Sequence, residues 1–264
     1  MDQLLQQVER LAEDYYKKYI SDKTSLVIAD VLEDIIIQQG IEVIYLQLPK
    51  LDEESRLLNG MFLKHVDASV QPKIVINQLD SARTQNFTLA HEWFHYILES
   101  EDLKKYDIHI SSNDVLERAG DYFAATILMN KDAFISYFEI IGGQAIEKKI
   151  YKLADIFKVP YVSVVRRIKE LGLWDVAVYA NFTEEQFIQS REDLLGESLL
   201  DTAPKRKQFE QFQEKVIVRE AAGTLPSIEA AKILADLNPP LAQTYYEKSA
   251  SAQDIDTLWD ELDE

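Results

Sequence analysis

Two histidines and a glutamate lie close together in residues 88–98, where the sequence reads TLAHEWFHYIL. His91 and His95 are four residues apart, and residues at that spacing lie on the same face of an α-helix. Two imidazoles placed in this way can bind one zinc ion. Glu92, next to the first histidine, can reach a water on the metal and act as a general base. The pattern therefore predicts a hydrolytic zinc site on a helix.

Histidine is rare in this chain, with four residues in 264. The alternative interpretation is a helix that carries two hydrogen-bonded, partly buried histidines and a surface glutamate. We favour zinc, because so few histidines seldom fall at this spacing beside a glutamate. The chain has no cysteine, so any metal must be bound through nitrogen and oxygen atoms.

A zinc hydrolase of this kind needs a third protein ligand and an open position for water. Glu117 lies near the start of a second predicted helix, which could pack beside the first. Asp121 is one turn further along and could accept a hydrogen bond from a ligand histidine, which would fix the tautomer of that ring. However, Asp114 and Glu117 also have the spacing of a capping box, a purely structural role. The residues alone leave both roles of Glu117 open.

The elements that must position these residues follow an α+β pattern. Periodicity predicts helices at 3–20 and 25–39, then strands at 41–48, 60–65 and 72–77, the last two paired antiparallel. Asp80 or Ser81 can cap the helix that carries the zinc motif, and Asn113 or Asp114 can cap the next one. We therefore predict a zinc metallopeptidase domain over residues 1–143, built from a small three-stranded sheet and packed helices.

A different unit follows, in which two predicted helices are broken at Pro160 as in a helix-turn-helix. Residues 144–173 hold seven basic and three acidic side chains. One interpretation has Arg166, Arg167 and Lys169 facing outward to dock on nucleic acid. We favour a helical hairpin that packs on the catalytic domain, because one basic helix in an acidic chain would make few phosphate contacts.

The remaining chain, 179–264, reads as an acidic and mainly helical region after a helix-turn-helix-like unit at 144–178. A short strand is predicted at 175–182. The last fourteen residues, 251–264, hold six acids and no base. They have the spacing of an amphipathic helix, although a solvated tail fits as well.

Composition limits the classes of function. The net charge is −18 and the isoelectric point is near 4.7, which opposes extensive nucleic-acid binding. With 47% hydrophobic residues, the chain can build a core. The N-terminus is a polar amphipathic helix rather than a signal peptide, and no apolar run is long enough to span a membrane. We expect a cytoplasmic protein with no membrane partner.

Two segments resemble the ImmA/IrrE family of metallo-endopeptidases. They are RTQNFTLAHE at 83–92 and ERAGDYFAATILM at 117–129. The family has a Phe-Thr-Leu-Ala lead into its His-Glu-x-x-His motif, and then a Glu four residues ahead of Asn or Asp. The strand at 73–77 and the unit at 153–173 are also similar to the family. The resemblance covers about 25–175 and does not extend to 180–264.

The resemblance implies a zincin-like catalytic domain. It implies that His91, His95 and Glu117 bind zinc, that Glu92 is the catalytic base, and that Asp121 supports a ligand histidine. It also implies a substrate: a helix-turn-helix repressor of a mobile element or a stress regulon, which cleavage would inactivate. A basic, DNA-binding substrate would suit the acidic chain by electrostatic steering.

The chain departs from the family pattern at three places. Phe94 replaces a glycine, Gly120-Asp121 replaces Ala-Asn, and Asn130 replaces a proline. We expect the ring of Phe94 to repack against the neighbouring helix.

Three functional hypotheses follow, in order of preference. The first is a zinc endopeptidase, in which His109 or Tyr122 could stabilise the oxyanion. The second is a non-catalytic anti-repressor that sequesters the repressor, with the acidic C-terminal region competing for its DNA-binding face. The third is a DNA-binding regulator that acts through residues 144–173.

Overall fold

The computed structural model describes residues 2–21, 27–48, 58–67, 69–99, 106–204, 210–235 and 237–260. Contacts divide the chain into two compact units, residues 1–204 and 205–264. The predicted boundaries after 143 and 178 stay predictions, because contacts show which segments pack together and not which fold alone. Within the described residues, no helix is both long and apolar enough to cross a membrane.

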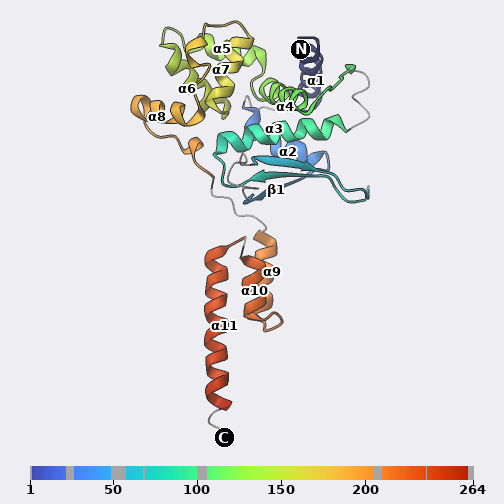
Figure 1. Ribbon diagram of the computed structural model, residues 1–264, viewed down its shortest axis with the longest axis vertical. Helices are drawn as coiled ribbons and strands as arrows, with labels where there is room; N and C mark the ends of the chain where they lie inside the picture. The colour runs from blue at the N-terminus through green and yellow to red at the C-terminus, as the bar shows by residue number, and fades with distance from the viewer. Residues whose placement is uncertain are drawn as a thin grey trace. The chain divides into compact units, whose positions relative to one another are not determined.

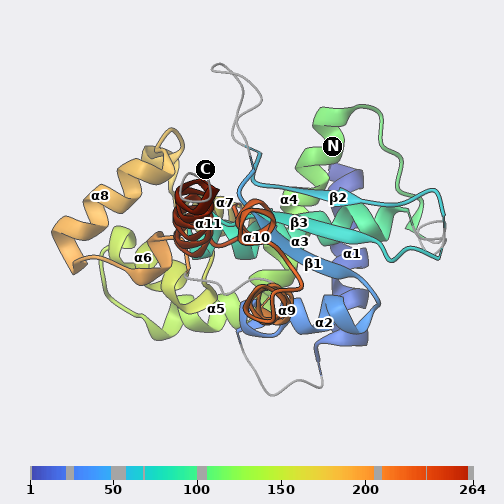
Figure 2. The ribbon, with the colours of Figure 1, turned by 90° about the horizontal axis from the view of Figure 1, so that it is seen from below.

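The first unit contains the predicted three-stranded sheet. Its strands are β1 (Glu42–Leu46), β2 (Gly60–Leu63) and β3 (Lys73–Asn77). β3 is central, antiparallel to β2 as predicted and parallel to β1 (Figure 2). The buried side chains of β3 explain its central place, since Ile74, Val75 and Ile76 are at most 4% exposed. β2 is therefore an edge strand, with one side of its backbone unpaired within the described sheet.

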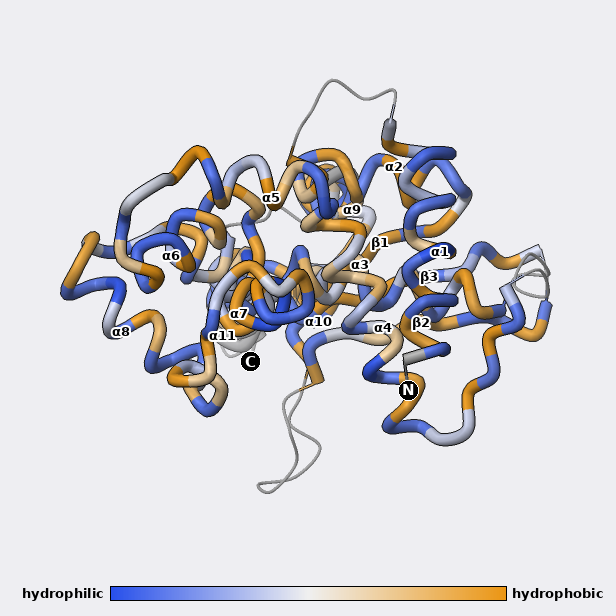
Figure 3. The backbone as a smooth tube through the Cα atoms, turned by 90° about the horizontal axis from the view of Figure 1, so that it is seen from above, coloured by the Kyte–Doolittle hydropathy of each residue, from blue (hydrophilic) through white to orange (hydrophobic). Residues whose placement is uncertain are grey.

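Helices cover the sheet in layers. The segment with His91, Glu92 and His95 lies on α3 (Ala82–Leu98), which packs on the sheet on one side and against α4 (Asn113–Leu128) on the other (Figure 1). α1 (Asp2–Tyr19) packs against α4. The predicted helix at 25–39 is a 3-10 turn, Ile28–Asp30, followed by α2 (Leu32–Gln38), and residues 25 and 26 lie outside the described chain. Hydrophilic and hydrophobic residues are interspersed along α1, as its amphipathic pattern predicts (Figure 3).

A serine is the N-cap of both α3 and α4. Ser81, one of the two predicted caps, accepts a hydrogen bond from the backbone N–H of Thr84. The prediction for α4 was wrong, because Ser112 is the cap and accepts from Val115. The cap therefore lies outside the proposed Asp114–Glu117 capping box.

Aromatic rings fill the space where α1, α3 and α4 meet. Trp93 and Phe123 stack edge to face, with ring centroids 5.8 Å apart, and both are fully buried. Phe94 is also fully buried, and its ring lies 5.3 Å from that of Phe123 on α4. The expected repacking of Phe94 against the neighbouring helix is thus confirmed.

The rest of the first unit is helical. It comprises α5 (Lys131–Ile140), α6 (Ile146–Phe157), α7 (Tyr161–Glu170) and α8 (Glu184–Leu195), with short 3-10 turns at Ala177–Tyr179 and Leu199–Asp201. The break at Pro160 is as predicted. The strand predicted at 175–182 was wrong, because the Asp175 side chain accepts a hydrogen bond from the backbone of Ala177 and closes a turn there.

The outward orientation considered for three basic residues of α7 holds for only two of them. Arg166 and Lys169 are exposed. Arg167 is fully buried, where it donates to the carbonyl of Met129 and pairs with Glu170. Burial of this guanidinium removes one of the three side chains that the DNA-binding hypothesis needed.

A buried arginine connects the start of α3 to the later helices. The Arg83 side chain is 1% exposed and pairs with Asp155 and with Asp201, the latter at 2.5 Å. It also donates to the carbonyl of Ala154 and to the hydroxyl of Tyr161. Because Asp201 belongs to this network, a segment more than 100 residues from α3 in sequence is held to the first turn of that helix.

The second unit is a set of three helices, α9 (Glu210–Ala221), α10 (Ser227–Leu234) and α11 (Pro239–Asp260). Its small core is made of six buried side chains: Val216, Ala230, Ala231, Leu234, Ala242 and Tyr245. Helix α11 extends into the acidic tail, but its side chains from 251 onward lie outside the described residues, as does the whole of 261–264. The predicted amphipathic face of the tail therefore stays a prediction.

Replacing Arg83 with methionine should destabilise the first unit by about 3–5 kcal/mol, because the change leaves the buried carboxylate of Asp201 without its cationic partner, whereas Asp155 keeps its ion pair with Arg191. The measurement is the free energy of unfolding in urea. Arg10→Met, at an exposed position of α1, is the matched control and should change stability by less than about 0.5 kcal/mol. Equal stability of the two variants would show that the Arg83 network is not a structural anchor.

Candidate metal centre

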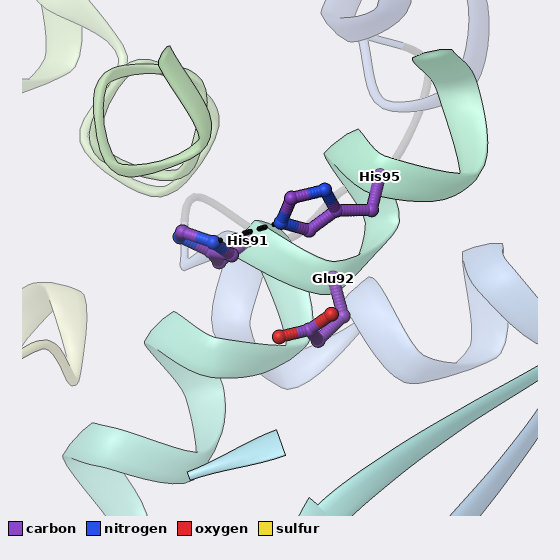
Figure 4. A group of neighbouring side chains, drawn as sticks. All are labelled: His91, Glu92 and His95. Atoms are coloured by element: carbon purple, nitrogen blue, oxygen red, sulfur yellow. Dashed lines mark hydrogen bonds between the residues drawn. The ribbon is translucent and has the colours of Figure 1, made fainter. Parts of the chain in front are cut away.

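The two histidines of α3 face each other at the surface of the helix. The Nε2 atoms of His91 and His95 are 3.1 Å apart, and the side chains are 11% and 18% exposed (Figure 4). The predicted i, i+4 arrangement is therefore present, with both Nε2 lone-pair positions directed at the same region. Together with Glu92, the two histidines place their ligand atoms within 4.8 Å of one another.

Glu117 brings a carboxylate from α4 to the same region. Its two oxygens lie 3.3 Å from the Nε2 of His91 and 3.8 Å from the Nε2 of His95. A tetrahedral zinc with bonds of about 2.1 Å would separate its ligand atoms by about 3.4 Å. The spacings of these three side chains fit such an ion, and the donor set of two imidazoles and a carboxylate suits zinc chemically.

Asp121 lies behind His91, on the side away from Glu117. Its Oδ1 is 3.1 Å from the Nδ1 of His91, so the ring can donate there and leave Nε2 free to bind a metal. Burial acts to raise the pKa of the Asp121 carboxyl, but His91 and Arg166 outweigh it and hold the pKa below its usual value. The carboxylate therefore stays charged beside the ring.

The histidines differ in their proton affinity. Burial acts to lower the pKa of His91, but the hydrogen bond to Asp121 and the charges of Glu92, Asp121 and Glu117 raise it overall. The pKa of His95 is lowered by burial and by the neighbouring charge of His91. His95 therefore loses its proton readily. His91 keeps its proton more firmly because three carboxylates surround it, and a bound metal cation could take the place of that positive charge.

Glu92 is the buried carboxylate of the site. It is 8% exposed, and burial together with the charge of Glu117 raises its pKa from 4.5 to about 7, against the opposing effect of His91. The backbone N–H of Phe62 on edge strand β2 donates to it. A carboxyl group with a pKa near neutrality can both accept and donate a proton, as general acid–base catalysis requires.

An open cleft of about 440 Å³ lies in front of these residues. Its walls are β2, the end of α3 and the start of α4, and its polar side chains are Glu92, His95, Glu99, Asn113 and Glu117. Asn113 is the only side-chain amide among the described lining residues. It lies one helical turn before Glu117, a spacing that could have identified it from sequence once Glu117 was placed.

The two oxyanion donors considered from sequence are placed elsewhere. His109 is 86% exposed and pairs with Asp107. Tyr122 lines a second cavity, together with Asp121 and Arg166, and not the cleft. Asn113 therefore replaces them as the candidate donor in the described part of the cleft.

At Gly120 the backbone of α4 lies directly against the ring of His91 on α3. A Cβ atom at this position would lie 2.8 Å from Cε1 of the His91 ring and 3.0 Å from its Nε2. Side-chain atoms do not approach so closely without a shift. Gly120, which departs from the family pattern, is thus the residue against which the ring of His91 packs.

The Peptidase M78 family model, described as an IrrE N-terminal-like domain, matches residues 37–169, half of the chain. None of the curated proteins matches this sequence. Among solved structures, a Mycobacterium tuberculosis transcriptional regulator aligns with 16% identity and a TM-score of 0.42. That match covers 61% of this chain and 46% of the regulator, and so weak a likeness does not bear on fold or activity.

Replacing Gly120 with alanine should weaken zinc binding about tenfold, because the new methyl group displaces the ring of His91. The dissociation constant is measured by competition with a chromophoric chelator. Gly143→Ala is the control, since nothing lies within 4 Å of a Cβ there, and it should leave zinc binding unchanged. Unchanged affinity in Gly120→Ala would mean that the ring has room to move.

In the metal-free protein, Glu92→Gln should raise stability above neutral pH by about 3 kcal/mol, the equivalent of the shift from 4.5 to about 7. The raised pKa means that the folded state favours the protonated carboxyl, so wild-type stability falls as pH rises from 4.5 through 7. The difference between the two proteins should therefore vanish below pH 4.5.

Thermal unfolding of chelator-treated protein between pH 4 and 9 measures this difference. Glu139→Gln, at an exposed position of α5, should follow the wild type at every pH. A constant offset between wild type and Glu92→Gln across the range would contradict the raised pKa.

Proposed function

Because this chain belongs to the Peptidase M78 family of IrrE N-terminal-like domains, we propose that it is a zinc-dependent endopeptidase that cleaves a helix-turn-helix transcriptional repressor. The observation that carries the proposal is the convergence of His91, His95 and Glu117 at spacings of 3.1–3.8 Å beside a buried Glu92. A site that can hold a cation next to a buried carboxyl can supply the Lewis acid and the general base for hydrolysis of a peptide bond.

In this proposal His91, His95 and Glu117 hold the zinc ion, which when bound supplies a Lewis acid that lowers the pKa of water and polarises a carbonyl. Asp121 fixes the tautomer of His91 through Nδ1. The chain offers no thiolate that could compete for the ion, because it has no cysteine.

Glu92 would accept the proton of the attacking water and pass it to the leaving amine. Its hydrogen bond from the Phe62 backbone keeps the carboxylate directed into the cleft. Asn113 would donate its side-chain amide to the developing oxyanion, a contribution typically worth 10²–10³ in rate. Both assignments place the chemistry inside the cleft of about 440 Å³.

A protein substrate fits the form of this cleft. It is open to solvent along the edge strand β2, which can accept an extended peptide by backbone pairing. The net charge of −18 would attract a basic DNA-binding partner. A helix-turn-helix repressor, the substrate that the ImmA/IrrE resemblance implies, has both properties, and its cleavage would restore transcription of a mobile element or a stress regulon.

Glu92→Gln tests the peptidase directly. The variant should keep its zinc and lose at least 10²-fold in the rate of repressor cleavage, because the general base is gone. Cleavage is measured by gel and mass spectrometry with purified repressor and zinc. Glu99→Gln, which changes another carboxylate lining the same cleft, should cleave at close to the wild-type rate. Wild-type cleavage by Glu92→Gln would rule out the mechanism.

The anti-repressor alternative is favoured by one observation, the separate helical unit at 205–264 with its own core. Binding alone predicts that Glu92→Gln still relieves repression and that removal of the unit abolishes relief. The truncation belongs after residue 204, because Asp201 pairs with Arg83 within the first unit and must be kept. Cleavage by residues 1–204 would support the peptidase over the alternative.

A further inference from the structure

Arg166 on α7 is a basic side chain that pairs with Asp121, the residue beside the candidate ligand His91. Its Nη1 lies 3.2 Å from Oδ2 of Asp121, while the other oxygen of Asp121, Oδ1, lies 3.1 Å from Nδ1 of His91. Arg166, Asp121 and His91 thus form a continuous chain of polar contacts that ends at a candidate metal ligand. The resemblance to known peptidases assigned a role to the last two residues and none to Arg166.

The geometry constrains the carboxylate from both sides. A carboxylate held by one oxygen can rotate about its Cβ–Cγ bond, whereas one held by both oxygens has a defined plane. Because Oδ1 faces His91 and Oδ2 faces Arg166, the guanidinium determines how Asp121 presents its acceptor to the ring. The orientation of an imidazole ligand follows from the hydrogen bond on its other nitrogen.

Helix α7 is held firmly enough to act through this contact. The next residue, Arg167, donates to the carbonyl of Met129 at the end of α4, which is the helix that carries Asp121. At the other end of α7, Glu184 of α8 accepts hydrogen bonds from the backbone of Tyr161 and Val162. The backbone at Arg166 is therefore anchored with respect to the metal centre.

The contact adds little to the stability of the fold. The side chains of Arg166 and Asp121 are 63% and 41% exposed, and ion pairs in water contribute weakly to stability. A cavity of about 510 Å³, lined by both residues, lies beside the pair. The pair is therefore suited to setting an orientation, and less suited to holding helices together.

We propose that Arg166 is a positioning residue for the metal centre, which fixes Asp121 and through it the ring of His91, and so links the helix-turn-helix-like pair α6–α7 to metal binding. The proposal rests on the proposed function only in taking zinc as the metal. It assigns Arg166, one of the two exposed basic side chains of α7, to the protein's own site and not to nucleic acid.

Arg166→Gln tests the proposal in the purified full-length protein. Its dissociation constant for zinc should rise about three- to tenfold, less than the 10–100-fold typical of a direct partner of a ligand histidine. The melting temperature of the metal-free protein should stay that of the wild type. Lys169→Gln is the matched control, because Lys169 lines the same cavity one turn further on and has no ion pair among the described residues.

A double-mutant cycle separates positioning from a general loss of positive charge. In an Asp121→Ala background, Arg166→Gln should have no further effect on zinc affinity, since the carboxylate through which it acts is gone. Equal zinc affinities of Arg166→Gln and Lys169→Gln would overturn the proposal. So would additive effects of Arg166→Gln and Asp121→Ala.

These measurements need no substrate. Tight zinc binding that depends on Arg166 through Asp121, in a protein that cleaves no repressor, would support the positioning role while the peptidase proposal failed. A wild-type protein that binds no zinc would overturn both.

Discussion

The close approach of α3 and α4 is the constraint on which the candidate site depends. The two histidines come from one helix and Glu117 from the other, so the distance between the helices decides whether three ligand atoms can share one ion. Gly120 lets the ring of His91 lie against the backbone of α4, while the aromatic rings of Trp93, Phe94 and Phe123 fill the space beside it. Core side chains are packed as tightly as organic crystals, so such a spacing is reproducible.

A second set of interactions ties this helix pair to the rest of the first unit. Arg83 joins α3 to α6 and to the 3-10 turn at Leu199–Asp201, and Asn86 of α3 donates to the carbonyl of Lys158 after α6. Buried charges are tolerated only when they are paired and hydrogen-bonded. The segment up to residue 204 is thereby part of the structure that supports the candidate metal centre, whereas residues 205–264 have a core of their own.

The site concentrates acidic side chains, in keeping with the acidic character of the chain. Three carboxyl groups lie close to the two histidines: those of Glu92, Glu117 and Asp121. A bound cation would offset part of their negative charge. Glu92 alone is buried enough for its pKa to reach about 7. Environment, and not residue type, thus separates one carboxyl suited to proton transfer from others suited to binding a cation or a ring.

Much of this could be predicted from sequence because it is local. The spacing of His91 and His95, the strand and helix order, and the break at Pro160 follow from backbone periodicity within a few residues. Glu117 and Asp121 were candidates from their place on the next predicted helix, and the family resemblance favoured the ligand role of Glu117 over the structural one. Sequence could not decide that Arg167 is buried, that Ser112 caps α4 or that residues 175–182 form a turn, because each depends on which neighbours compete for the same backbone or space. Only the tertiary structure brings Arg166 to Asp121 and Gly120 to His91, since contacts between distant segments are set by packing and leave no periodic signal in the chain.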